Sequence, residues 1–87
     1  MEQFILHDGT VIEGAAGLAE NYLWLWFKGY TFSEVYSLFS NPEKTASIDY
    51  HFGEMNTLHE GYTDLRAISF DSGDFVSVCL RKAVNNA

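Results

Sequence analysis

One segment, residues 21–28, most constrains what this chain can fold into, because it is apolar on both faces that a β-strand would present. Alternate side chains of a strand point to opposite sides. One side would carry three rings with polar tips: Tyr22, Trp24 and Trp26. The other would carry purely apolar groups: Leu23, Leu25 and Phe27. A small domain rarely covers both sides of a strand with its own chain. We therefore expect either a helix on one side and a partner on the other, or a sheet that curls tightly around itself.

Length and composition predict a single folded domain over residues 1–87. With 47% hydrophobic and 16% aromatic residues, the chain has enough apolar material for a core, and its hydrophobicity is too high for intrinsic disorder. A domain of this size buries about 60–65% of the surface that its unfolded chain exposes, so we expect modest stability.

Turn signals divide most of the chain into short strands. Asp8-Gly9 between two apolar runs predicts a hairpin, because glycine readily adopts the positive φ of the turn. Residues 14–19 are small and predict a loop, and residues 53–61 are polar and turn-like. Residues 44–52 alternate as a half-buried strand, and residues 62–70 and 75–82 predict strands around a hairpin loop at residues 71–74. Leu65 and Ala67 fall out of phase with Ile68 and Phe70, which indicates a bulge or a two-sided strand.

A helix is predicted between these strands. Thr31 and Glu34 fit a capping box, in which each side chain satisfies a free backbone N–H group of the other residue. The apolar residues that follow have helical spacing: Phe32, Val35, Leu38 and Phe39. Asn41-Pro42 ends the helix, because the residue before proline avoids the helical region. The fold class is thus α+β: a mainly antiparallel sheet of about five or six short strands, with one short helix packed on one face.

Charge limits the classes of partner. The chain has 5 basic and 12 acidic residues, a net charge of −7. Phosphate backbones are bound by lysine and arginine, so direct binding of nucleic acid is disfavoured, and so is binding to a membrane surface. Acidic side chains gather between residues 42 and 74, where they form either a solvated face or a surface for a basic partner. The candidates for such an acidic face include Asp49, Glu54, Glu60 and Asp64.

No pattern in the sequence favours catalysis. His51 and His59, with Glu54 and Glu60 nearby, could form a metal site, but their spacing matches no metal signature and surface histidines are the simpler interpretation. Cys79, the only cysteine, lies in a predicted strand without a cationic neighbour or helix terminus to activate it. Nucleotide-binding and hydrolase motifs do not occur in the sequence. We therefore expect no enzymatic activity, no cofactor and no metal.

The aromatic residues favour a protein interface instead. Tyrosine and tryptophan combine an apolar body with a polar tip and are enriched where proteins meet. Tyr22, Trp24 and Trp26 are the candidate partner-binding residues, with the two tryptophans as anchors. The alternative is that these rings fill the core of a domain that is poor in aliphatic residues.

Several turn and cap motifs carry a resemblance to a known group. They are Asp8-Gly9-Thr10, Gly29-Tyr30-Thr31, residues 41–45, residues 60–63 and the closing residues 76–80. Together they resemble small uncharacterised proteins of tailed phages and prophages from gut Firmicutes, over most of the chain. The resemblance implies a bacterial cell and a mobile element, and it implies no activity or functional residue.

These observations lead to three hypotheses. The first is a non-enzymatic, phage-derived structural or protein-interaction module, which binds a protein partner or self-associates into a homo-oligomer. It would use the aromatic strand or an exposed sheet edge. The second is an acidic inhibitor that mimics nucleic acid and occupies a host nucleic-acid-binding protein. The third and weakest is a small metal-dependent enzyme. We expect a cytoplasmic location in the bacterial host, or association with the virion, since the first residues lack the features of a secretion signal.

Overall fold

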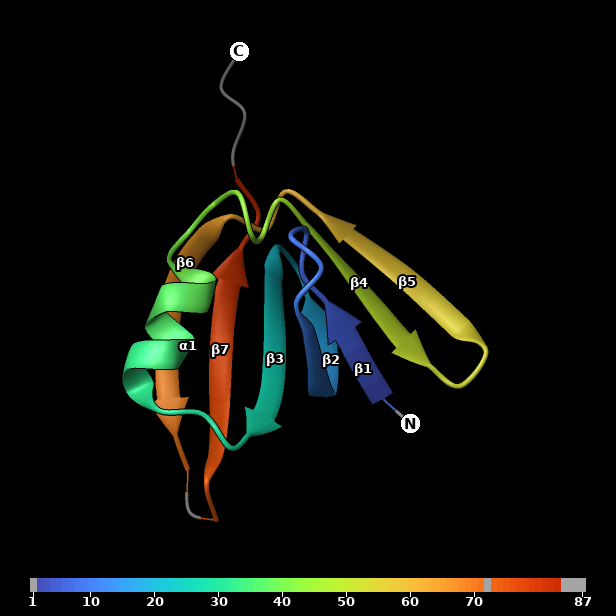
Figure 1. Ribbon diagram of the computed structural model, residues 1–87. Helices are drawn as coiled ribbons and strands as arrows, with labels where there is room; N and C mark the ends of the chain where they lie inside the picture. The colour runs from blue at the N-terminus through green and yellow to red at the C-terminus, as the bar shows by residue number, and fades with distance from the viewer. Residues whose placement is uncertain (1, 72, 84–87) are drawn as a thin grey trace.

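The computed structural model describes residues 2–71 and 73–83, which form one antiparallel sheet of seven strands and one short helix (Figure 1). The strand order across the sheet is β5-β4-β1-β2-β3-β7-β6. The elements are β1 (Glu2–Ile5), β2 (Val11–Ala19), β3 (Tyr22–Lys28), α1 (Phe32–Phe39), β4 (Ser47–Phe52), β5 (Met55–Glu60), β6 (Asp64–Phe70) and β7 (Phe75–Arg81). The α+β class and the antiparallel sheet are therefore confirmed, whereas the expected number of strands was too small.

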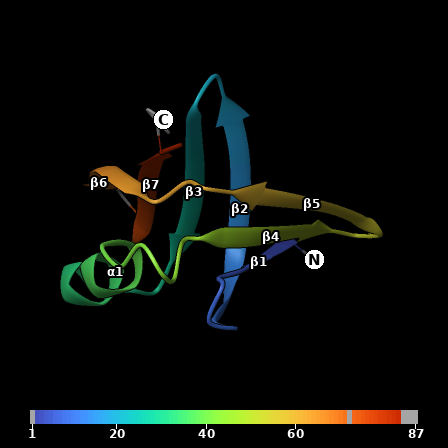
Figure 2. The same cartoon turned by 90° about the horizontal axis from the view of Figure 1, so that it is seen from above.

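Strand β2 bends the sheet into a half-barrel. Its first residues pair with β1, and its residues from Gly14 onward pair with β3. As a result the β4–β5 hairpin runs at a steep angle to β3 and β7, which is visible from above (Figure 2). A Cβ atom at Gly14 would collide with the backbone oxygen of Trp26 and lie 2.9 Å from the Cβ of Phe27. Only glycine permits this close approach of two strands.

The core lies on the inner, concave face of the sheet. Its buried members come from every strand except β5 and β6, from α1 and from the connections: Phe4, Leu6, Ile12, Leu23, Leu25, Phe27, Val35, Phe39, Ile48, Tyr62, Val76, Val78 and Leu80. Helix α1 covers part of this face (Figure 1). The rings of Phe39 and Phe27 stand 5.6 Å apart, centroid to centroid, beneath it. Burial of these side chains is what holds the short helix, which would be unstable alone.

The hairpin turn, the helix cap and the bulge that the sequence predicts are all present in the structure. At the β1–β2 hairpin Gly9 has φ 92°, and its N–H group donates to the oxygen of Leu6 at 2.9 Å. The capping box is present: the Thr31 hydroxyl accepts from the N–H of Glu34 at 3.3 Å, and the Glu34 carboxylate accepts from the N–H of Thr31 at 3.1 Å. The bulge is also confirmed, as a register shift between Leu65 and Ala67 of β6.

Two segments predicted as loops are strands, and the first of them accounts for the additional strand. Residues 55–60 form the edge strand β5, which pairs along its whole length with β4 and is polar because most of it faces solvent. The small residues 14–19 continue β2 instead of forming a loop, since they allow β2 and β3 to approach closely. In the predicted hairpin loop at residues 71–74, Ser72 lies outside the described residues, whereas Gly73 has φ 83°.

Candidate protein interface

Strand β3 separates its two sets of side chains completely. Leu23, Leu25 and Phe27 point to the inner face and are at most 1% exposed. Tyr22, Trp24 and Trp26 lie on the outer, convex face, where the first two are half-buried and Trp26 is 39% exposed. Helix α1 packs on the inner face, and Figures 1 and 2 show no other described element over the outer side of β3. The structure combines parts of the two expected alternatives, a helix on one side and a curved sheet, and it leaves this outer aromatic face uncovered.

The rings of the two tryptophans stack on each other. Their rings are nearly parallel, with 6.4 Å between centroids and 16° between planes. The ring of Trp26 reaches over β2, where an added Cβ at Gly17 would stand 3.1 Å from its Cζ3 atom. Because Gly17 has no side chain, the indole can lie this close to the backbone of β2. We call Tyr22, Trp24 and Trp26 the outer aromatic face.

Trp24 and Trp26 are the cross-strand neighbours of two buried residues on the outer side of β7. Trp24 lies directly opposite Cys79, and Trp26 lies opposite Ser77. Cys79 is only 4% exposed and Ser77 only 8%, although both belong to the outer face of the sheet. Burial raises the pKa of the Cys79 thiol, which the positive charge of Arg66 lowers to a smaller extent. The thiol is therefore shielded and protonated at neutral pH, unlike a nucleophilic cysteine.

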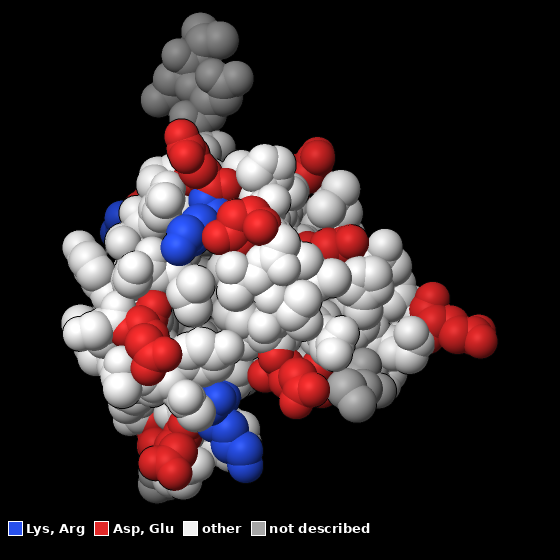
Figure 3. Space-filling view, viewed as in Figure 1, with Lys and Arg blue, Asp and Glu red and all other residues white. Residues whose placement is uncertain are grey.

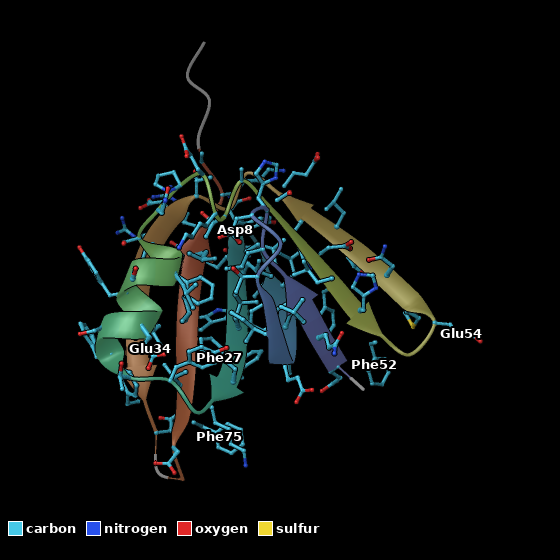
Figure 4. All side chains as sticks on the ribbon, viewed as in Figure 1. Asp8, Phe27, Glu34, Phe52, Glu54 and Phe75 are labelled. Carbon is cyan, nitrogen blue, oxygen red and sulfur yellow. The ribbon has the colours of Figure 1, made fainter. Side chains whose placement is uncertain are left out.

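A groove lies beside Trp26, at the end of the sheet where Phe75 begins β7 (Figure 4). It has a volume of about 590 Å³, and its lining includes Glu13, Trp26, Lys28 and Phe75. The Lys28 ammonium stands 5.3 Å from the centroid of the Phe75 ring, a cation–π contact. Phe75 is 46% exposed. The outer aromatic face thus continues into a recess with charges of both signs at its rim.

The predicted acidic residues do not form one surface. Glu54 lies at the tip of the β4–β5 hairpin (Figure 4), at the opposite end of β5 from Glu60. Asp49, on the outer side of β4, stands 3.2 Å from Nε2 of His51. Asp64 begins the strand at the other edge of the sheet, where its carboxylate accepts from Arg66 at 3.4 Å. Figure 3 likewise shows separate groups of carboxylates on the face that carries α1.

The two candidate metal-binding histidines face opposite sides of the sheet. His51 is on the outer side with Asp49. His59 pairs with the buried Ile48 on the inner side, where it is 8% exposed and its ring stands 6.0 Å from that of Tyr62. Burial lowers the pKa of His59, and the charge of Asp49 opposes this more weakly. Among the described residues, no group of three or more His, Cys, Asp or Glu side chains could hold a metal ion.

A second aromatic surface was missed by the sequence analysis. Phe32 had been predicted on the buried side of the helix, but it is 58% exposed because α1 lies at the edge of the sheet. Its ring stacks on that of Tyr36 at 6.2 Å and stands 5.9 Å from that of Phe70 on β6. The i, i+4 spacing of Phe32 and Tyr36 was the available signal that one side of the helix would carry both rings.

Comparison of the chain with protein-family models, with curated proteins and with solved structures finds no match. Within residues 2–71 and 73–83, no helix has the length and apolar character needed to cross a membrane.

Proposed function

We propose that this protein is a non-enzymatic interaction module that binds another protein through its outer aromatic face. The observation that carries the proposal is the tryptophan pair on β3: Trp24 and Trp26 lie on the side of the sheet that no described element covers. The inner side chains of this strand belong to the core, and its outer side chains include the stacked tryptophan pair, of which Trp26 is 39% exposed. Such a module would serve a structural role in a phage or prophage particle.

The chemistry of this face suits a protein partner. Tryptophan and tyrosine supply large contact areas at low conformational cost, and they dominate the binding energy of many interfaces. The recess beside Trp26 can accept a protruding side chain, while Lys28 and Glu13 at its rim allow polar contacts. Nucleic acid is a poor partner, because only 5 basic residues stand against 12 acidic ones.

The alternative function, an acidic inhibitor that mimics nucleic acid, has less support. Such a mimic needs carboxylates arranged along one surface. Here Glu54 and Glu60 lie at opposite ends of β5, and Asp49 and Asp64 each contact a basic side chain of the same chain. The third hypothesis, a metal-dependent enzyme, loses its candidate site because His51 and His59 face opposite sides of the sheet.

A paired capture experiment tests the proposed function. The wild-type protein, Trp26→Ala and Met55→Ala would be immobilised in equal amounts and exposed to the same bacterial lysate. Met55 is the matched control, because it is 67% exposed but lies on β5, away from the outer aromatic face. We expect at least one protein to bind wild type and Met55→Ala equally and to be lost with Trp26→Ala. Equal capture by all three would contradict the proposal.

Self-association through the same face has a separate readout. In Trp24→Phe, Trp26 is the only tryptophan, so its fluorescence reports on this face alone. If copies associate there, emission shifts to shorter wavelength and acrylamide quenching weakens as the protein concentration rises. Light scattering at low and high salt then distinguishes an apolar contact from an ionic one, since salt screens only the latter.

A further inference from the structure

The recess beside Trp26 is lined by small residues as well as by aromatic rings. Gly14 and Ala15 of β2 lie opposite Phe27 and Trp26 of β3, and all four line the recess. Because neither Gly14 nor Ala15 has a large side chain, a space of about 590 Å³ stays open here. Trp26 is 39% exposed and Phe75 is 46% exposed. A side chain that enters the recess would therefore lie against aromatic groups.

Two carboxylates line the same recess, and both lack a basic partner. They belong to Glu2 at the start of β1 and Glu13 on β2. The ion pairs found in residues 2–71 and 73–83 involve neither of them. The Glu2 carboxylate accepts a hydrogen bond from the Tyr50 hydroxyl at 3.1 Å, which is a neutral partner. The negative charge of both groups is thus left without a counter-charge.

Lys28 is the one base that lines the recess, and it lies over a different ring. Its Nζ atom stands 5.3 Å from the ring centroid of Phe75, the residue opposite it on β7. Tryptophan is the ring that attracts a cation most strongly, yet no lysine or arginine of the described chain lies over Trp26. Two carboxylates and one ammonium leave the recess with an excess of negative charge. A second cation would therefore be bound favourably beside Trp26.

We propose that this recess binds an arginine side chain of the protein partner, with the guanidinium against the ring of Trp26 and hydrogen-bonded to Glu13. Arginine suits the site better than lysine, because its planar group stacks on an indole and donates two hydrogen bonds to one carboxylate. An acidic side chain would be repelled by Glu2 and Glu13. A purely apolar side chain would take water from both carboxylates and give no hydrogen bond in return.

The arginine site rests on the proposed function, because it specifies the chemistry of the partner that meets the outer aromatic face. It differs from nucleic-acid mimicry in needing one arginine in one recess, and not a row of carboxylates along the surface. The net charge of −7 adds a long-range attraction for a partner whose surface around that arginine is basic.

NMR measures the weak binding of a single side chain directly. A blocked peptide of four glycines around one arginine would be titrated into the ¹⁵N-labelled protein, and the indole N–H signal of Trp26, assigned with Trp24→Phe, would be followed. A peptide with citrulline, which has nearly the same shape but no charge, is the control ligand. The protein variants are Glu13→Gln, Lys28→Met and, as the matched control, Glu54→Gln at the tip of the β4–β5 hairpin (Figure 4).

We expect the arginine peptide to shift the Trp26 signal with a dissociation constant in the millimolar range, and the citrulline peptide to leave it in place. Glu13→Gln should raise that constant about threefold or more. Lys28→Met should lower it, because a competing positive charge is removed, and Glu54→Gln should not change it. Equal shifts with citrulline, or a constant that ignores Glu13→Gln, would overturn the inference.

The lysate experiment separates a failure of the arginine site from a failure of the proposed function. If Trp26→Ala loses the captured protein but the arginine peptide does not bind, the arginine site is wrong and the proposed function stands. If the peptide binds as expected but wild type and Trp26→Ala capture the same proteins, the arginine site stands and the proposed function fails.

Discussion

Trp24 lies directly across from Cys79 on the outer face of the sheet, and Cys79 is almost completely buried. Side chains that face each other in this way have their Cβ atoms about 5 Å apart. We therefore expect the indole to shield the thiol. A chemical measurement on Cys79 consequently reports on the position of Trp24.

We predict that Trp24→Ala makes Cys79 react with a thiol reagent about tenfold faster or more under native conditions. The variant should also lose about 2 kcal/mol of stability to urea, because a large partly buried ring is removed. Trp26→Ala is the control: it uncovers Ser77 rather than Cys79, so the thiol should stay protected. An unreactive thiol in a folded Trp24→Ala protein would show that another group covers it.

Gly14 and Gly17 should differ sharply in their tolerance of alanine. At Gly14 the new methyl group would collide with backbone of β3, which cannot move without breaking the sheet, so we expect a loss of about 3 kcal/mol. At Gly17 it would meet only the outer end of the Trp26 ring, which can shift, so we expect less than about 1 kcal/mol. Urea denaturation of both variants measures the difference. Equal losses would mean that β2 does not approach β3 as described.

His59 should make the stability depend on pH. Its pKa in the folded protein is lowered, mainly by burial, from a value near 6.5 in the unfolded chain. As pH falls through about 6.5, the unfolded chain takes up a proton that the folded protein resists, so the free energy of unfolding decreases. Above about 7 both forms are neutral, and this contribution no longer changes.

The measurement is urea denaturation at a series of pH values between about 5 and 8. His59→Gln should flatten the loss of stability below pH 6.5, whereas His51→Gln, on the outer side of β4, should retain it. If His59→Gln leaves the profile unchanged, another group causes the dependence.

The capping box should contribute measurably to the stability of α1. Thr31→Ala removes the hydroxyl that accepts from the N–H of Glu34, and we expect a loss of about 1 kcal/mol. Ser37→Ala, at an exposed position on the same helix, should change stability by less than about 0.5 kcal/mol. Thermal unfolding of the two variants side by side would reveal the difference, and similar midpoints would refute a role for the cap.

Features that depend on neighbouring residues were predictable from the sequence. The hairpin at Asp8-Gly9, the capping box at Thr31 and the bulge near Leu65 each follow from local backbone chemistry, and the structure has all three. The division of β3 into two faces follows from the period of a strand. The sheet nevertheless has a seventh strand, β5, and a longer β2 than predicted, because neither β5 nor the second half of β2 has an apolar alternation to signal it.

The candidate site was predictable only in part, since it depends on which strands are neighbours. Strand period places Tyr22, Trp24 and Trp26 on one face, but it cannot say that Cys79 lies opposite Trp24 or that Gly17 lies against the ring of Trp26. The dispersal of the acidic residues has the same origin, because β5 and β6 occupy opposite edges of the sheet. The exposure of Phe32 likewise depends on where α1 packs against the sheet, which the sequence of the helix alone does not determine.

The order of strands also shapes how the chain acquires its structure. Strands β1, β2 and β3 are joined by short turns and can pair early, whereas β3 gains its second neighbour only when β7 inserts between it and β6. Pairings between distant parts of a chain form slowly. Until then the edge of β3 is open and apolar on both sides, which makes the nascent chain prone to aggregation. The strand at the centre of the finished core is thus an open sheet edge until β7 pairs with it.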